Sequence, residues 1–175
     1  MKTKIKVRLI DNQIPLKIIE NGDWIDLRLN QDYSFEGPKA NTLKRKKIEN
    51  NFRWVDSQIH YLPLGVAMQL PKGYEAIVAA RSSAAKNLGI IIANGIGIID
   101  NSYNGDEDEW MFPAYPVRTN TITKGTRLCQ FRIQLSQKAT VWQKLKWLFS
   151  NGIKIEIVDH LNNTPRGGFG STGEL

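Results

Sequence analysis

The sequence contains few of the residues that most catalytic and metal-binding sites use. Among 175 residues there is one cysteine, Cys129, and there are two histidines, His60 and His160. These three residues do not complete the four-ligand set of a structural zinc site, and no two of them have ligand spacing. A single cysteine forms no disulfide within its own chain, whereas a secreted domain of this size usually carries several. We therefore expect no zinc site and a reducing, cytoplasmic environment.

Long apolar runs and the common nucleotide-binding loops are also missing. The N-terminus alternates charged and apolar residues and has no apolar stretch of the signal-peptide type. The most apolar window, residues 89–99, is interrupted by Asn94 and is shorter than the roughly 20 residues that cross a bilayer. No G-x-x-x-x-G-K-[ST] loop is present, and no G-x-G-x-x-G follows a predicted strand. We expect neither membrane insertion, nor a nucleotide-triphosphate motor, nor a dinucleotide enzyme.

The length and composition indicate one globular domain with an uneven charge. Hydrophobic residues make up 41% of the chain and charged residues 23%, which is typical of a single folded core at this length. The net charge of +7 favours a polyanionic partner, with nucleic acid as the first candidate. Residues 39–53 contribute +5 of this charge, through Lys39, Lys44, Arg45, Lys46, Lys47 and Arg53 against Glu49. The rest of the chain is therefore only mildly basic.

Much of the chain alternates apolar and polar residues, the pattern of strands with one buried face. The clearest runs are residues 4–9, with Ile5, Val7 and Leu9 on one face, and 128–135, with Cys129, Phe131, Ile133 and Leu135 on one face. Further β-rich runs lie at 64–70, 74–80, 89–99 and 154–158, separated by turn signals at 71–73, 104–105 and 124–125. Seven or more short strands without helical patterns between them predict an all-β sandwich, jelly roll or barrel.

One segment, residues 140–149, has helical spacing instead. Val141, Leu145 and Leu148 recur along one face, and the following Asn151-Gly152 suits a helix C-cap. We predict a short amphipathic helix here. Its aromatic residues, Trp142, Trp147 and Phe149, are expected to pack on the β core rather than to bind a partner.

Small polar clusters follow several predicted strands. Arg81-Ser82-Ser83 is suited to hold an oxyanion, although a plain surface turn has the same composition. Asp100 ends a strongly apolar strand, where its carboxylate is either solvated or placed for chemistry. The glycine-rich segment 165–173 is able to wrap a phosphate when ordered, or is a disordered terminus.

In this order, the clusters resemble the motifs of the trimeric dUTP diphosphatases, or dUTPases. The resemblance runs from about residue 20 to 173, and its segments are Gly22–Leu27, Arg81–Ser83, Asn94–Gly105, Gly125–Gln130 and Arg166–Gly173. The variant forms are similar to those of a subgroup from Gram-positive bacteria and their phages. The resemblance implies an all-β jelly roll or distorted β-barrel with one short helix. It also implies a homotrimer in which each site draws on more than one chain.

The same resemblance implies a division of the chain. Residues 1–161 would form the β domain, with a basic insertion at about 39–57 and a helical insertion at about 140–151. Residues 162–175 would form a flexible, glycine-rich C-terminal arm that closes the active site.

The implied reaction is hydrolysis of dUTP to dUMP and diphosphate, which keeps uracil out of DNA. By similarity, Asp100 orients and deprotonates a water molecule that attacks the α-phosphorus; a carboxylate of ordinary pKa is ionised at neutral pH. Tyr103 is expected to lie flat against the deoxyribose, where a 2′-hydroxyl has no room. Asn94, with the backbone around Gly97 and Ile98, is expected to pair with the uracil edge.

The other implied site residues contact the phosphates, the metal or the base. The phosphate-binding set by similarity is Arg81, Ser82, Ser83, Gln130, Arg166, Ser171 and Thr172. Asp26 is expected to hold Mg²⁺ through water, with the ion bound mainly by phosphate oxygens. Phe169 is the expected lid over the uracil, and the segment Trp110–Phe112 is the alternative lid.

Two other functions remain open at this point. The chain is also similar to the dCTP deaminases, which have the same fold as the dUTPases and similar nucleotide contacts. Those enzymes, however, have a second Arg and a catalytic Glu at the positions where this chain has Lys86 and Trp110. Glu107 and Glu109 lie close to the second position. Alternatively, the basic insertion serves a regulatory role by binding nucleic acid or a host regulatory protein, although a charge run is more often a solvated loop.

Overall fold

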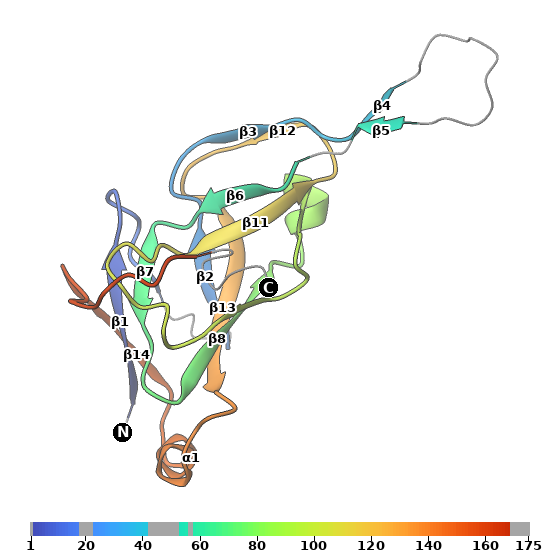
Figure 1. Cartoon of the computed structure of the whole chain (residues 1–175). Helices are drawn as coiled ribbons and strands as arrows, with labels where there is room; N and C mark the ends of the chain where they lie inside the picture. The colour runs from blue at the N-terminus through green and yellow to red at the C-terminus, as the bar shows by residue number, and fades with distance from the viewer. Residues whose placement is uncertain (1, 18–22, 42–52, 56–57, 169–175) are drawn as a thin grey trace.

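The computed structural model describes residues 2–17, 23–41, 53–55 and 58–168, and it consists mainly of short strands (Figure 1). The strands are β1 (Thr3–Leu9), β2 (Ile25–Arg28), β3 (Tyr33–Phe35), β4 (Lys39–Asn41), β5 (Arg53–Val55), β6 (His60–Pro63), β7 (Val66–Gln69), β8 (Tyr74–Ala80), β9 (Ile90–Ile92), β10 (Gly97–Ile99), β11 (Met111–Pro116), β12 (Asn120–Ile122), β13 (Arg127–Leu135) and β14 (Ile153–Ile157). A π-helical turn, η1 (Ala84–Leu88), and one α-helix, α1 (Val141–Leu148), complete the described elements.

The strands form several small sheets around one core. Their orders are β14-β1-β7, β10-β8-β13-β2 and β6-β11-β9, and two further pairs, β12-β3 and β4-β5, form ribbons. All pairs are antiparallel except β1 with β14. In Figure 1 the β4-β5 ribbon projects beyond the β3-β12 ribbon, at the opposite end of the molecule from α1. The predicted all-β, jelly-roll-like fold is confirmed.

Alternation along the strands places the core as the sequence predicts. Ile5 and Val7 of β1 are fully buried, and so are Cys129 and Phe131 of β13. Leu128 is also fully buried, because the register of β13 against β2 shifts between Arg127 and Cys129. A bulge of this kind puts two consecutive residues opposite one and interrupts the alternation.

The apolar run at 89–99 is two strands rather than one. Strand β9 pairs with β11, whereas β10 pairs with β8 in another sheet. The chain reverses between them at Gly95, whose φ of 72° lies in the left-handed region that glycine adopts without steric cost. This turn carries the chain from one sheet to the next and places β10 at a sheet edge.

The predicted helix is present, with different surroundings from those expected. Thr140 caps its N-terminus through a capping box with Gln143. The helix ends at Leu148 with Phe149 as the C-cap, so the expected cap at Asn151-Gly152 is wrong.

The aromatic residues of this helix do not all pack on the core. Trp147 meets Tyr74 edge-on with ring centroids 5.4 Å apart, as expected. The prediction is wrong for Trp142 and Phe149, which are 76% and 72% exposed. These two residues are seven positions apart and so share a helix face, and that face points away from the sheet.

The insertion at about 39–57 is described only in part. Its ends pair as β4 and β5, and the basic residues 44–47 lie outside the described residues.

Among the helices that the structure describes, none combines the length and apolar character needed to span a bilayer.

Cys129 provides a direct test of this core. Burial, with a smaller effect from the charge of Asp26, raises the pKa of its thiol and suppresses the reactive thiolate. We predict that a colorimetric thiol reagent leaves the native protein unlabelled over a period in which it labels the single cysteine completely in denaturant. Equal labelling rates in the two conditions would contradict the buried position.

Candidate active site

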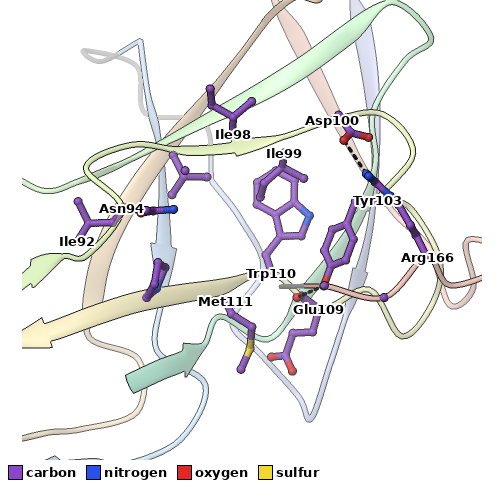
Figure 2. A pocket seen from close by; sticks show the side chains of 15 residues that line it. Ile92, Asn94, Ile98, Ile99, Asp100, Tyr103, Glu109, Trp110, Met111 and Arg166 are labelled. Atoms are coloured by element: carbon purple, nitrogen blue, oxygen red, sulfur yellow. Dashed lines mark hydrogen bonds and ion pairs between the residues drawn. The ribbon is translucent and has the colours of Figure 1, made fainter. Parts of the chain in front are cut away.

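A cavity of about 270 Å³ opens between β10, the loop after it, the start of β11 and the C-terminal segment (Figure 2). Asp100, Tyr103 and Arg166 lie together at one end of this cavity, and Asn94 lies at the other. Of the predicted site residues, Asn94, Gly97, Ile98, Asp100, Tyr103 and Arg166 line it. The structure therefore brings the motif segment Asn94–Gly105 and the start of the segment Arg166–Gly173 to one place.

Strand β10 gives the cavity a backbone edge. It pairs with β8 on one side, with Gly97 opposite Val78, and it is the outermost strand of its sheet. The outer edge of such a strand presents N–H and C=O groups that the ladder does not use. Gly97 suits this position because a Cβ there would lie 3.3 Å from the Cβ of Val78. This edge is suited to hydrogen-bond a planar ligand with alternating donors and acceptors.

Asp100 lies at the end of β10, in a turn that hydrogen bonds hold in place. Its Oδ1 accepts hydrogen bonds from the backbone N–H of Ser102, at 2.8 Å, and from the Ser102 hydroxyl. Its Oδ2 accepts one from Nη1 of Arg166 at 2.6 Å. Partial burial raises the pKa of the Asp100 carboxyl, but the hydrogen bonds and the charge of Arg166 outweigh burial and lower it overall. The side chain is 54% exposed, so an ionised carboxylate faces solvent at the cavity.

Tyr103 is held rigidly beside Asp100. Its hydroxyl donates to the carbonyl oxygen of Glu109 at 2.8 Å. Burial, together with the charges of Asp108 and Glu109, raises the pKa of Tyr103 to about 12, so the ring stays neutral. The C-terminal segment passes close by, since a Cβ on Gly168 would lie 3.2 Å from the Tyr103 hydroxyl.

The remaining described site residues form a second group, on the β2-β13-β8 part of the sheet. Asp26 of β2 pairs with Arg81, at 3.3 Å, and with Arg127, at 3.1 Å. Gln130 lies directly opposite Asp26 in the ladder, and the exposed Ser82 and Ser83 follow Arg81. These residues do not line the cavity. The other three predicted residues, Phe169, Ser171 and Thr172, lie outside the described residues.

Asp26 is not arranged as a direct metal ligand. Its carboxylate is 12% exposed and two guanidinium groups occupy its oxygens. Within the described part of the chain, no three His, Cys, Asp or Glu residues converge closely enough to hold a metal ion. The residues present therefore fit a metal only if its other ligands are oxygens of a bound phosphate and water.

The two aromatic residues of the alternative lid are packed in the core. Trp110 and Phe112 are both fully buried, and the Trp110 ring packs edge-on against Phe131 with centroids 5.3 Å apart. Neither residue is free to open and close over a ligand in this structure. Trp110 forms part of the cavity wall from its fixed position, and Met111 also lines the cavity.

Sequence reasoning missed two residues that shape this site. Ser102 holds the carboxylate of Asp100, and its position two residues after an aspartate is a common turn pattern that indicates such a contact. Asp108, which binds the backbone of Arg166, had no recognisable signal because its partner lies 58 residues away.

Comparison with known proteins follows this geometry. The family model described as dUTPase matches residues 52–173. The SPbeta prophage-derived deoxyuridine 5′-triphosphate nucleotidohydrolase of Bacillus subtilis is 42% identical over 171 residues, covering 97% of this chain and 98% of that protein. The deoxyuridine 5′-triphosphate nucleotidohydrolase of Anaplasma marginale is 33% identical, covering 84% and 95%.

Solved structures agree at the level of the fold. The dUTPase from Streptococcus mutans superposes with a TM-score of 0.59 at 17% identity, covering 77% of this chain and 98% of that one. A mutant dUTPase from phage phi11 of S. aureus, described as coordinating a structural Mg(II) ion, gives 0.57 at 14% identity, covering 78% and 94%.

The ion pair at the cavity is open to measurement. We predict that Arg166→Ala raises the pKa of the Asp100 carboxyl, because it removes a hydrogen bond and a positive charge while partial burial remains. The check is a ¹³C NMR titration of the side-chain carboxyls, with Lys138→Ala, at an exposed position, as the control. A pKa that stays the same or falls would contradict the pairing.

Proposed function

The chain belongs to the dUTPase family and hydrolyses dUTP to dUMP and diphosphate, and we propose that Asp100 is the base for this reaction. The observation that carries this role is an ionised, half-exposed carboxylate at the end of a cavity with a backbone edge. Asp100 takes a proton from a water molecule as the water oxygen attacks the α-phosphorus. The bond between the α-phosphorus and its bridging oxygen breaks, and diphosphate leaves.

The cavity is suited to the uracil and the deoxyribose rather than to the whole nucleotide. Its volume of about 270 Å³ is slightly below the range of roughly 300–1,000 Å³ that is common for small-molecule sites. Uracil would pair with the backbone edge at Gly97 and Ile98 and with the side chain of Asn94. Tyr103, neutral and fixed by its hydrogen bond to Glu109, would cover the deoxyribose and leave no room for a 2′-hydroxyl.

The triphosphate then needs residues from elsewhere. Arg81, Ser82, Ser83 and Gln130 form the remaining described polar set, and they do not line the cavity of their own chain. We place them on the phosphates of a neighbouring chain's substrate, in a homotrimer whose three sites each join two such surfaces. A phosphate would compete with Asp26 for Arg81, because both offer oxygens to the same guanidinium.

The C-terminal arm would complete the site. Residues 162–175 are assigned to this arm, and 1–161 to the β domain. When dUTP binds, Arg166 would exchange the carboxylate of Asp100 for the γ-phosphate, which frees Asp100 to accept a proton. Phe169 would cover the uracil, and Ser171 and Thr172 would contact the γ-phosphate.

Mg²⁺ fits this arrangement as an ion that arrives with the substrate. When bound, the ion neutralises charge on the phosphates and helps to orient them. Asp26 would reach it through water, since both of its oxygens pair with arginines.

The residues at the cavity favour dUTP hydrolysis over dCTP deamination. Trp110 occupies the position that corresponds to the deaminase glutamate, and it is buried in the core. The neighbouring Glu109 uses Oε1 to accept a hydrogen bond from the backbone N–H of Gly65 at 2.7 Å. Trp110 therefore offers no carboxylate at the position of the deaminase base, and one oxygen of Glu109 is committed to the backbone of Gly65.

We predict that Asp100→Asn lowers kcat for dUTP by about 10²- to 10⁴-fold, because the amide no longer accepts the proton of the attacking water. Binding of a nonhydrolysable dUTP analogue, measured by calorimetry, should persist, since the side chain keeps its shape. Glu107→Gln removes a nearby exposed charge and serves as the control. Near-normal turnover in Asp100→Asn would remove Asp100 as the base.

Truncation after Pro165 tests the arm. We predict that light scattering gives the mass of three shortened chains, and that kcat/KM for dUTP falls by about a hundredfold or more, because the groups that position the γ-phosphate are lost. Dissociation of the trimer on truncation would instead make the arm an assembly element.

A further inference from the structure

The segment that leads into the arm lies along the loop that follows Asp100. Oδ1 of Asp106 accepts the backbone N–H of Leu161 at 2.6 Å. Two residues further on, Asn163 donates its side-chain amide to the carbonyl of Asn104 at 3.2 Å. These contacts hold the chain at Leu161 and Asn163 against the loop at Asn104 and Asp106, about 55 positions earlier in the sequence. They set the direction in which the arm leaves the domain.

Asp108 makes the most concentrated contact between these two segments. Its side chain is almost fully buried, with the residue 1% exposed. Both of its oxygens accept the backbone N–H of Arg166 at 3.0 Å, and Oδ1 also accepts that of Gly167 at 3.1 Å. Oδ2 accepts the N–H of Gly105, in its own loop, at 2.8 Å. One buried carboxylate therefore ties three backbone amides from two segments, which offsets the cost of burying its charge.

The two segments also fit together without space for a side chain. A Cβ on Gly105 would lie 2.5 Å from Cα of Pro165, the residue before Arg166. The backbone of the arm therefore crosses the loop in direct contact, just before the residues that Asp108 binds. This crossing and the hydrogen bonds of Asp108 both fix the point from which the Arg166 side chain extends.

We propose that Asp108 is a positioning residue. It anchors the backbone of the C-terminal arm at Arg166 and Gly167 and thereby positions the Arg166 guanidinium at the Asp100 end of the cavity. This role rests on the proposed function of Arg166 and Asp100 in dUTP hydrolysis. Asp108 itself touches backbone amides, not the reacting atoms.

The position of Arg166 in the structure follows from this anchor. From its held backbone, the guanidinium reaches Oδ2 of Asp100 at 2.6 Å and the hydroxyl of Ser102 at 2.7 Å. Because Asp108 holds only the backbone of Arg166, rotation about the bonds of the long side chain is sufficient to move the guanidinium from Asp100 to a phosphate. The anchor thus fixes the backbone at Arg166 and Gly167 before substrate binds, which lowers the entropy cost of bringing the Arg166 guanidinium to a phosphate.

Asp108→Asn tests the anchor in the free protein. The variant keeps the shape of the side chain but has one acceptor oxygen instead of two for three amides. Trypsin cuts the Arg166–Gly167 bond, and mass spectrometry follows release of residues 167–175. We expect release to be about tenfold faster or more than in wild type, because cleavage follows the population of the open segment. The matched control, Glu107→Gln, removes the adjacent exposed charge and should leave the rate unchanged.

A second readout separates an anchor from general support of the fold. Loss of the negative charge of Asp108 by itself would lower the pKa of Asp100, whereas release of Arg166 would raise it. We expect the pKa of Asp100, measured by ¹³C NMR, to rise in Asp108→Asn and to rise no further when Arg166→Ala is added. A fall, or no change, in the single variant would overturn the proposal.

Hydrogen exchange on the wild-type protein covers the case in which Asp108→Asn does not fold. The amides of Arg166 and Gly167 should exchange at least about tenfold more slowly than in an unstructured peptide, and exchange at the peptide rate would overturn the anchor. None of these measurements uses dUTP. Absence of dUTP turnover in the wild type would therefore refute the proposed function, whereas the anchoring role of Asp108 is tested independently by the measurements above.

Discussion

The antiparallel pairing of β8 with β13 is the constraint on which both groups of site residues depend. It is a continuous ladder from Cys129 opposite Ala80 to Leu135 opposite Tyr74. Strand β10 pairs with the outer side of β8, and β2 pairs with the outer side of β13. A slip of one residue in this ladder would exchange the two faces, turning Cys129 to solvent and Gln130 into the core. Arg81 at the end of β8, Gln130 on β13 and Asp100 at the end of β10 are thus placed by one register.

Ion pairs between carboxylates and arginines hold both groups of site residues. Asp26 holds Arg81 and Arg127, and Asp100 holds Arg166. Each guanidinium is therefore already positioned, and in the proposed function a phosphate replaces a carboxylate as the partner of Arg81 and of Arg166. The net charge of +7 first indicated nucleic acid, yet most of it lies in residues 39–53. The arginines of the proposed site are paired with acids, which accords with a single nucleotide as the polyanion that they meet.

The sequence predicted local features better than it predicted their surroundings. Alternation correctly placed Ile5, Val7 and Cys129 in the core, and helical spacing correctly located α1. The exposure of Trp142 was not predictable in this way, because periodicity gives the faces of a helix but not which face meets the sheet. In the run 89–99, apolar content alone did not show that Gly95 divides it between two sheets.

The family and the fold class were predictable from the sequence, because alternation and short motifs are patterns of residues that are close together in the chain. The division of the proposed site residues into a cavity group and an arginine group was decided by the tertiary structure, as was the burial of Trp110 and Phe112. So was the tie between Asp108 and Arg166. These features depend on hydrogen bonds and contacts between segments that only the folded sheets bring together, and no local pattern encodes which distant amide a carboxylate will meet.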